Sequence, residues 1–523
     1  MSLPTPSKDL TLIPPHPITE TESTPLLAHP PLTKPQNTYY NPKHKPLIVV
    51  SICVLCVLVL EIGVYLQLTP ITRILESIIC RNYYLAHPET GLVSPIPEAE
   101  CKIAAVQSEL TMLRGWAMLF DCLPSRWFVK SGGLADEGIG VCLTVPYGFV
   151  ADKYGRKPVL MLSLLGLFAS MVWIFVVCSF PDVFPIKCTW FSSLFLIIGG
   201  GGGVAQSSIF TFIADVVDET HRTPIFFGAY ALILITQMVS IPLGSVLMEK
   251  DLWLPMYLSL GLLGLSVLVI IPMPETLNRD VESTESSSLT NHDEEESSKP
   301  GNVFTQILET SRDTLYGFKS LFTSTMITVL VFTFLVNGLT TSSANLYLQY
   351  ASRRYHWTIA EAGFLLPLRS GVQLAMLLLI LPYISHLLVK YGHFSINKKD
   401  LYIARVSVVS LMLGCIGIGL SPTPVVMAFF LVIYSLGFGF PVAVRSLATS
   451  LVEPHHIARL YAAIATLDNI GGMISGPMLS MLYSRGLSLD GAWVGLPFLA
   501  SGVAYALVGV PLWVTRLRSH RCP

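Results

Sequence analysis

Residues 148–157 read GFVADKYGRK and are the most informative ten residues of the chain. An uncharged segment ends at Gly148, where the missing side chain allows close approach of a neighbouring helix. Asp152 follows among several cations, and Gly155 permits a tight turn before the next uncharged segment. Positive charge in a short loop between apolar segments is typical of the cytoplasmic face of a membrane protein. The pattern predicts a charged hairpin between two membrane-spanning helices, in which Asp152 is either a pairing group or incidental.

The composition indicates a chain that lies mostly in lipid. Of its 523 residues, 52% are hydrophobic and 13% are charged, against about 25% charged in soluble globular proteins. The formal net charge is −1, so no basic excess indicates binding to nucleic acid. We predict an integral membrane protein built of helices, with no nucleic-acid partner.

Eleven apolar runs are long enough to cross a hydrocarbon core of about 30 Å as helices. They are residues 47–68, 158–180, 190–214, 225–248, 252–273, 324–346, 362–389, 401–421, 424–450, 458–483 and 492–514. A twelfth span is expected between residues 104 and 150. The predicted fold class is all-α, with twelve transmembrane helices in two six-helix bundles.

Polar segments divide the chain into five predicted parts. The first 45 residues are rich in Pro, Thr and Ser and are too poor in apolar residues to pack. A serine-rich acidic segment after the sixth span reads as a solvated linker. The parts are a disordered cytoplasmic tail (1–45), an N-terminal bundle (46–274), a cytoplasmic linker (275–319), a C-terminal bundle (320–516) and a short cytoplasmic tail (517–523).

Lysine and arginine in the short loops predict that both chain ends lie in the cytoplasm. The polar loop at residues 69–103 would then face the outside. Cys80 and Cys101 lie in this loop and would pair if it meets an oxidising compartment. Sequence spacing alone leaves the disulfide open, because it does not show whether the two Cα atoms approach each other.

The charged loop resembles the signature of the major facilitator superfamily, G-x-x-x-D-x-x-G-R-K, which follows the second span. The match is complete at Gly148, Asp152, Gly155, Arg156 and Lys157. A weaker copy, VKYG at 389–392, follows the eighth span and lacks the acid. The resemblance implies two parallel halves with a central site between them. It also implies a gating latch, with Asp152 and Arg156 as latch residues rather than substrate ligands.

Further fragments resemble a fungal branch of this superfamily that is distantly similar to the proton-coupled folate and haem carriers. They are residues 79–81, 101–102, 106–110, 274–276 and 445–449. Many members of that branch accompany secondary-metabolite pathways as exporters. The resemblance therefore implies an exporter without fixing its substrate.

The expected second span is interrupted by a polar segment at residues 125–139, which holds four charged side chains. Each would cost about 3 kcal/mol in hydrocarbon. Removing the segment leaves a span of normal length, so we predict an insertion that comes from a retained intron or a gene-model error. The alternative is a re-entrant loop that lines a cavity. Sequencing of the transcript distinguishes the two.

Ionisable side chains inside the predicted spans are functional candidates, because charge is expensive in lipid. Glu61 and Asp121 lie in neighbouring spans of the first half, and these two or Asp468 would carry a proton. Arg369 is expected to face the central site and attract an anionic substrate group. Arg445 and Asp468 lie in neighbouring spans of the second half, either as a functional couple or as a static ion pair.

Together these patterns predict a secondary transporter that works by alternating access and is not an enzyme. The expected activity is proton-coupled export of a small organic metabolite. The alternatives are proton-coupled uptake of an organic anion and a non-transporting membrane sensor of the same fold. Expected partners are a small-molecule substrate, protons and the lipid bilayer. We expect a monomer in the plasma membrane, with a vacuolar or vesicle membrane as the alternative, and no cofactor or metal site.

Overall fold

The computed structural model describes residues 46–90, 96–122, 144–275, 325–392, 394–452 and 457–514. All regular structure within these ranges is helical. The predicted insertion at 125–139 lies outside the described residues. We call residues 46–275 the N-terminal half and residues 325–514 the C-terminal half.

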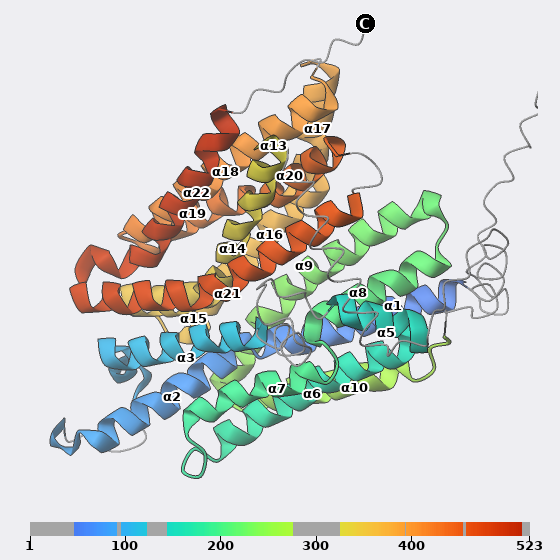
Figure 1. Ribbon diagram of the computed structural model, residues 1–523. Helices are drawn as coiled ribbons and strands as arrows, with labels where there is room; N and C mark the ends of the chain where they lie inside the picture. Colours follow the sequence, from blue (N-terminus) through green and yellow to red (C-terminus); the bar gives the residue numbers. More distant parts are fainter. Residues whose placement is uncertain are drawn as a thin grey trace, which may run out of the picture. The chain divides into compact units, whose positions relative to one another are not determined.

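The N-terminal half begins with two helices that follow each other directly and ends with the short apolar helix α10 (Figure 1). Its helices are α1 (Pro46–Leu66), α2 (Leu68–Ala86), α3 (Ala104–Cys122), α5 (Thr144–Tyr154), α6 (Arg156–Ser179), α7 (Ser192–Ile197), α8 (Gly201–Val216), α9 (Glu219–Lys250) and α10 (Leu254–Ile270). A 3₁₀ turn, η2 (Glu98–Lys102), precedes α3.

The C-terminal half is built the same way, from long apolar helices joined by short connections. Its helices are α13 (Thr325–Phe332), α14 (Asn337–Tyr355), α15 (Ile359–Gly363), α16 (Leu365–Ala375), α17 (Leu381–Lys390), α18 (Ile396–Leu420), α19 (Pro424–Leu436), α20 (Gly439–Ser450), α21 (Ile457–Leu489) and α22 (Leu496–Val514).

The apolar runs of the sequence become helices because a backbone in lipid must satisfy its own hydrogen bonds. Among the described residues, nine helical segments are long and apolar enough to cross a membrane, and Leu254–Ile270 is a shorter apolar helix. Large exposed side chains such as Leu379, Val425 and Leu507 are apolar, as expected of surfaces that face lipid.

Each half has its own buried core. In the N-terminal half the core gathers side chains from α1, α2, α3, α6, α8 and α10, including Cys53, Leu110 and Ile209. In the C-terminal half the ring of Tyr347 stacks on Phe498, with centroids 5.3 Å apart, inside a larger core. The larger core also includes Ile241 of the N-terminal half, so some buried side chains connect the two halves.

The first span is longer than the sequence predicts. We expected a loop from residue 69, but helix continues through α2 to Ala86. The polar side chains that suggested a loop, such as Thr72 and Glu76, are fully buried against other protein groups. A polar residue that faces protein does not interrupt a helix, and hydropathy alone cannot tell which neighbour it faces.

The two halves meet most extensively where α3 packs along α21 (Figure 1). Gly115 and Gly476 lie at this contact, and a Cβ atom on Gly115 would be 2.9 Å from the carbonyl oxygen of Gly476. Helices approach this closely only where side chains are absent. The hydroxyls of Ser108 and Ser484 form a hydrogen bond of 2.5 Å across the same interface.

Candidate functional site

A cavity of about 440 Å³ is lined by residues of both halves, and we call it the central cavity. The N-terminal half contributes Tyr65, Leu68 and Gln237. The C-terminal half contributes polar side chains of α14 and α16 together with apolar ones of α18 and α20. These include Asn337, Thr340, Thr341, Asn345, Arg369, Gln373, Leu411, Phe438 and Phe440. The size and the mixed lining are those of a site for a small organic molecule.

Arg369 on α16 is the cation of the central cavity and is 7% exposed. Its Nη2 donates a hydrogen bond of 3.1 Å to the carbonyl oxygen of Thr340. The guanidinium carbon lies 5.8 Å from the ring centroid of Tyr347. The Nε–H group is buried without a hydrogen-bond partner among the described residues. The sequence placed Arg369 inside a span, and the structure places it on the cavity wall.

Glu61 lies on α1, one helical turn before Tyr65, and is half-buried. The phenol of Tyr65 lines the central cavity and interacts electrostatically with both Glu61 and Arg369. A carboxyl group, a phenol and a guanidinium group are thus grouped where α1 faces the C-terminal half. Glu61 is not among the described lining residues, and Tyr65 lies between it and the cavity in the chain of interactions.

Asp468 on α21 accepts a hydrogen bond of 2.8 Å from the side-chain amide of Asn337, which lines the cavity. Arg445 is exposed on α20, with its guanidinium carbon 5.6 Å from the ring centroid of Phe334. Asp468 is therefore hydrogen-bonded to Asn337 and also interacts electrostatically with Arg445. The sequence predicted that Arg445 and Asp468 are neighbours because their spans are neighbours. It did not show which face of each helix carries the charge.

Asp121 lies in the last turn of α3, away from the residues that line the central cavity. Its Oδ1 accepts a hydrogen bond of 2.6 Å from the hydroxyl of Ser193 on α7. This contact joins two helices of the N-terminal half.

The signature residues 148–157 form the end of α5, a turn at Gly155 and the start of α6. Gly155 has φ = +115°, a conformation that side-chain-bearing residues rarely adopt. A Cβ atom there would lie 2.7 Å from Oε2 of Glu275. The backbone N–H groups of Arg156 and Lys157 donate hydrogen bonds of 3.0 Å to the Glu275 carboxylate. Glu275 therefore supplies the negative charge favoured at the start of α6.

Further contacts tie this loop to the N-terminal half. Arg156 forms an ion pair with Asp215 at the end of α8. Lys157 Nζ donates a hydrogen bond of 2.6 Å to the carbonyl oxygen of Ile271. Gly148 is exposed, with no atom within 4 Å of a Cβ built on it. The side chain of Asp152 lies outside the described residues. Glu275, which the sequence assigned to the acidic linker, is instead bound to the signature loop.

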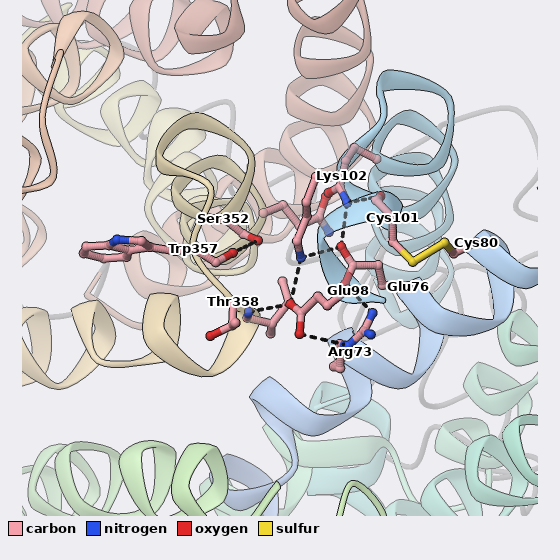
Figure 2. A network of polar contacts seen from close by, with 12 residues as sticks. Arg73, Glu76, Cys80, Glu98, Cys101, Lys102, Ser352, Trp357 and Thr358 are labelled. Atoms are coloured by element: carbon pink, nitrogen blue, oxygen red, sulfur yellow. Dashed lines mark hydrogen bonds and ion pairs between the residues drawn. A yellow bond between two sulfur atoms is a disulfide. The ribbon is translucent and has the colours of Figure 1, made fainter. Parts of the chain in front are cut away.

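A second charged cluster, which we call the clasp, joins α2 to the segment before α3 (Figure 2). It consists of Arg73, Glu76, Glu98, Lys102 and Gln107. The carboxylate of the fully buried Glu76 accepts hydrogen bonds from Lys102 Nζ at 2.7 Å, Gln107 Nε2 at 2.6 Å and Arg73 Nη1 at 2.9 Å. Glu98 receives Lys102 Nζ at 2.8 Å and Arg73 Nε at 3.1 Å. Two carboxylates and two cations thus neutralise each other.

The clasp also reaches the C-terminal half. The backbone N–H of Ile359, at the start of α15, donates a hydrogen bond of 2.8 Å to Oε1 of Glu98 (Figure 2). Cys80 on α2 and Cys101 in η2 form a disulfide, with their Cα atoms 5.4 Å apart. The disulfide holds Lys102 next to Glu76, so the pairing that the sequence left open supports the contact between the halves.

Arg114 on α3 is a residue of the cavity region that the sequence analysis missed. Its Nη2 donates a hydrogen bond of 2.7 Å to Asn345, which lines the central cavity, and its Nη1 bonds to the hydroxyl of Thr72. Arg114 interrupts an apolar stretch between residues 104 and 122. The rule that singled out Glu61, a charge inside a span, would have found it.

Comparison with known proteins agrees with this architecture. The sequence model of the Major Facilitator Superfamily matches residues 138–476. The chain belongs to this superfamily and is a multi-pass membrane transporter.

Two fungal relatives are similar over most of the chain. The MFS efflux pump atnC of Emericella nidulans is 35% identical over 509 residues, which cover 95% of this chain and 93% of that protein. The efflux pump ustT of Aspergillus flavus is 30% identical over 461 residues, covering 87% and 85%.

Solved structures show the same fold at low identity. A D-xylose–proton symporter superposes with a TM-score of 0.61 at 11% identity, covering 91% of this chain and 98% of that chain. The human organic anion transporter MFSD10 superposes with a TM-score of 0.53 at 15% identity, covering 90% and 100%. At these identities the likeness concerns the fold alone.

Proposed function

We propose that this protein exports a small organic metabolite by alternating access, coupled to protons, with the central cavity as the transport site. The observation that carries the proposal is a cavity lined by both halves of the chain. A site shared in this way changes shape whenever the halves rock against each other. The direction of transport is proposed from the relatives, whose names describe efflux pumps.

The contacts between the halves support a state in which the clasp side is shut. Glu98 holds the start of α15, and α3 packs on α21 through Gly115 and Gly476. Given the orientation predicted from the charged loops, this side faces the exterior. The alternate state requires that these contacts break and that new ones form near the signature loop, where the resemblance places the latch residues Asp152 and Arg156.

Glu61 and Asp468 are the proposed proton carriers, because each interacts with a residue that lines the cavity. Glu61 acts on Tyr65, and Asp468 is bonded to Asn337. Asp121 remains a weaker candidate because its carboxylate is engaged by Ser193. We further propose a monomer in the plasma membrane.

Deletion of the gene in its own host identifies the substrate. Cells that lack an exporter retain a compound that wild-type cells release, which comparison of cell and medium extracts detects. The compound is then offered to proteoliposomes under an imposed pH gradient. Movement against the proton flow supports export, movement with it supports uptake of an organic anion, and binding without flux supports a sensor.

The variant Glu61→Gln tests proton coupling in the same proteoliposomes. Without a titratable carboxyl group, transport driven by the pH gradient is expected to fall about tenfold or more, while exchange of substrate against substrate persists. Glu249→Gln, at an exposed position near the end of α9, is the control and should leave both rates unchanged. Gradient-driven transport by the Glu61 variant at the wild-type rate would remove Glu61 from the mechanism.

A further inference from the structure

Arg369 is a buried cation that the described residues leave incompletely paired. It is 7% exposed, and among the described residues it donates a hydrogen bond to a backbone carbonyl oxygen while its Nε–H has no partner. A buried charge without an opposite charge is strongly unfavourable in a low-dielectric surrounding. A protein that keeps such a group at a cavity wall therefore leaves it for a ligand of opposite charge.

Among the described residues, the rest of the cavity wall supplies no such charge. The other polar groups of the lining are amides, hydroxyls and phenols, among them Asn337, Thr341 and Gln237. Two carboxyl groups interact with lining residues: Asp468 accepts a hydrogen bond from Asn337, and Glu61 interacts electrostatically with Tyr65. Among the described lining residues the charged group is Arg369, so a negative charge on the ligand would complement it.

The apolar part of the lining indicates what accompanies that charge. Leu411, Phe438 and Phe440 contribute a non-polar surface to the cavity, and the phenol rings of Tyr65 and Tyr434 add flat faces. Aromatic faces bind flat apolar groups well. The edge of a guanidinium group matches a planar carboxylate better than a point charge does.

We propose that the central cavity binds a planar organic monoanion, a carboxylate on an aromatic or apolar body, through the guanidinium group of Arg369. This inference rests on the proposed function only in taking the central cavity as the transport site. Arg369 is a binding and specificity residue in this proposal. The amides and hydroxyls around it bond the remaining polar groups of the ligand.

Binding by the purified full-length protein in detergent tests the proposal without any need for transport. The probes are benzoate, 1-naphthoate and indole-3-acetate at pH 7, each paired with its neutral primary amide. At least one carboxylate should bind about tenfold or more tightly than its amide, as one charge-assisted hydrogen bond requires. Equal affinity for acid and amide in all three pairs, or no binding of any acid, overturns the proposal.

Substitutions connect the preference to Arg369. Arg369→Gln should abolish the preference for the acid, whereas Arg369→Lys should retain part of it because the charge remains without the planar edge. Arg485→Gln, at an exposed position of α21, removes one charge from the same half and should preserve the preference. A preference that survives in a folded Arg369→Gln protein also overturns the proposal.

Flux measurements keep this inference apart from the proposed function. If the acids bind through Arg369 and no substrate moves in proteoliposomes, the anion site stands and the transport proposal fails. If the metabolite found in the host moves and Arg369→Gln carries it at the wild-type rate, transport stands and the anion site fails.

Discussion

The clasp and the signature loop are both charged clusters at helix ends, yet they hold different things together. The clasp pairs two carboxylates with two cations, and Glu98 accepts one hydrogen bond from the backbone N–H of Ile359 in the C-terminal half. The signature loop binds Glu275 and Asp215, both in the N-terminal half. The difference teaches that charge near a helix end is no guide to its role. The partner decides whether a cluster holds one half together or fastens two.

The largest expected effect comes from breaking the clasp at its buried carboxylate. Glu76→Ala removes one of the two carboxylates and leaves the buried Lys102 with Glu98 alone, which should cost about 3–5 kcal/mol of stability. Thermal unfolding in detergent measures the loss. Glu109→Ala, an exposed acid on α3, is the control and should change the melting temperature little. A Glu76→Ala protein that melts with the wild type would show that the clasp contributes nothing.

The disulfide is the next test of the clasp. It closes a loop with a sequence separation of 21, so the double variant Cys80→Ser and Cys101→Ser should lose about 3 kcal/mol. Reduction of the wild type by dithiothreitol should lower the melting temperature similarly. Cys53→Ser, at a free buried cysteine, controls for the change of residue type. If reduction leaves melting unaltered, the clasp does not depend on its covalent link.

Substitutions at two glycines, Gly155 and Gly148, test the geometry of the signature loop. Gly155→Ala forces a side chain onto φ = +115° and toward Glu275, which should cost about 1–3 kcal/mol. Gly148→Ala meets no atom within 4 Å and should be tolerated. Thermal unfolding of the two variants side by side measures this. Equal losses would contradict the local geometry of the loop.

The smallest expected effect is the pH dependence of the clasp. Burial raises the pKa of Glu98, but Lys102 and Arg73 outweigh burial, so its pKa lies below the ordinary value of 4.5. Between the folded and unfolded pKa values the unfolded chain binds more protons, and stability therefore rises with pH. The contribution of Glu98 should be complete above about pH 5 and should be lost as the pH falls below 4.5.

Melting temperatures measured between pH 3.5 and 7 test this, with Glu98→Gln as the comparison. The difference between wild type and variant should shrink toward acid pH. A difference that stays constant over this range would mean that the Glu98 carboxylate is not stabilised by its two cations.

Much of the architecture was predictable because a segment that crosses lipid must be apolar and must pair its own backbone hydrogen-bonding groups. The apolar runs became helices, and the residues of the signature loop identified the superfamily that the comparisons show. The extension of the first span through α2 was not predictable from hydropathy. Its polar residues face protein, and Glu76 in particular pairs with Lys102, 26 residues away, and accepts a hydrogen bond from Gln107, 31 residues away.

The candidate site was predictable only in part. A charge inside a span drew attention to Arg369 and Glu61, and the same rule applies to Arg114. The sequence could not show that Arg369 and Tyr65, from opposite halves, line one cavity. It also could not show that Asp468 accepts a hydrogen bond from Asn337.

The sequence by itself determined that this chain crosses the membrane many times in a pattern typical of its superfamily, because every backbone group in lipid must be paired and every charge there is costly. Only the tertiary structure decided which charges meet. Pairing depends on distances of a few ångströms between helices that are far apart in sequence, and those distances follow from close packing at positions such as Gly115 and Gly476.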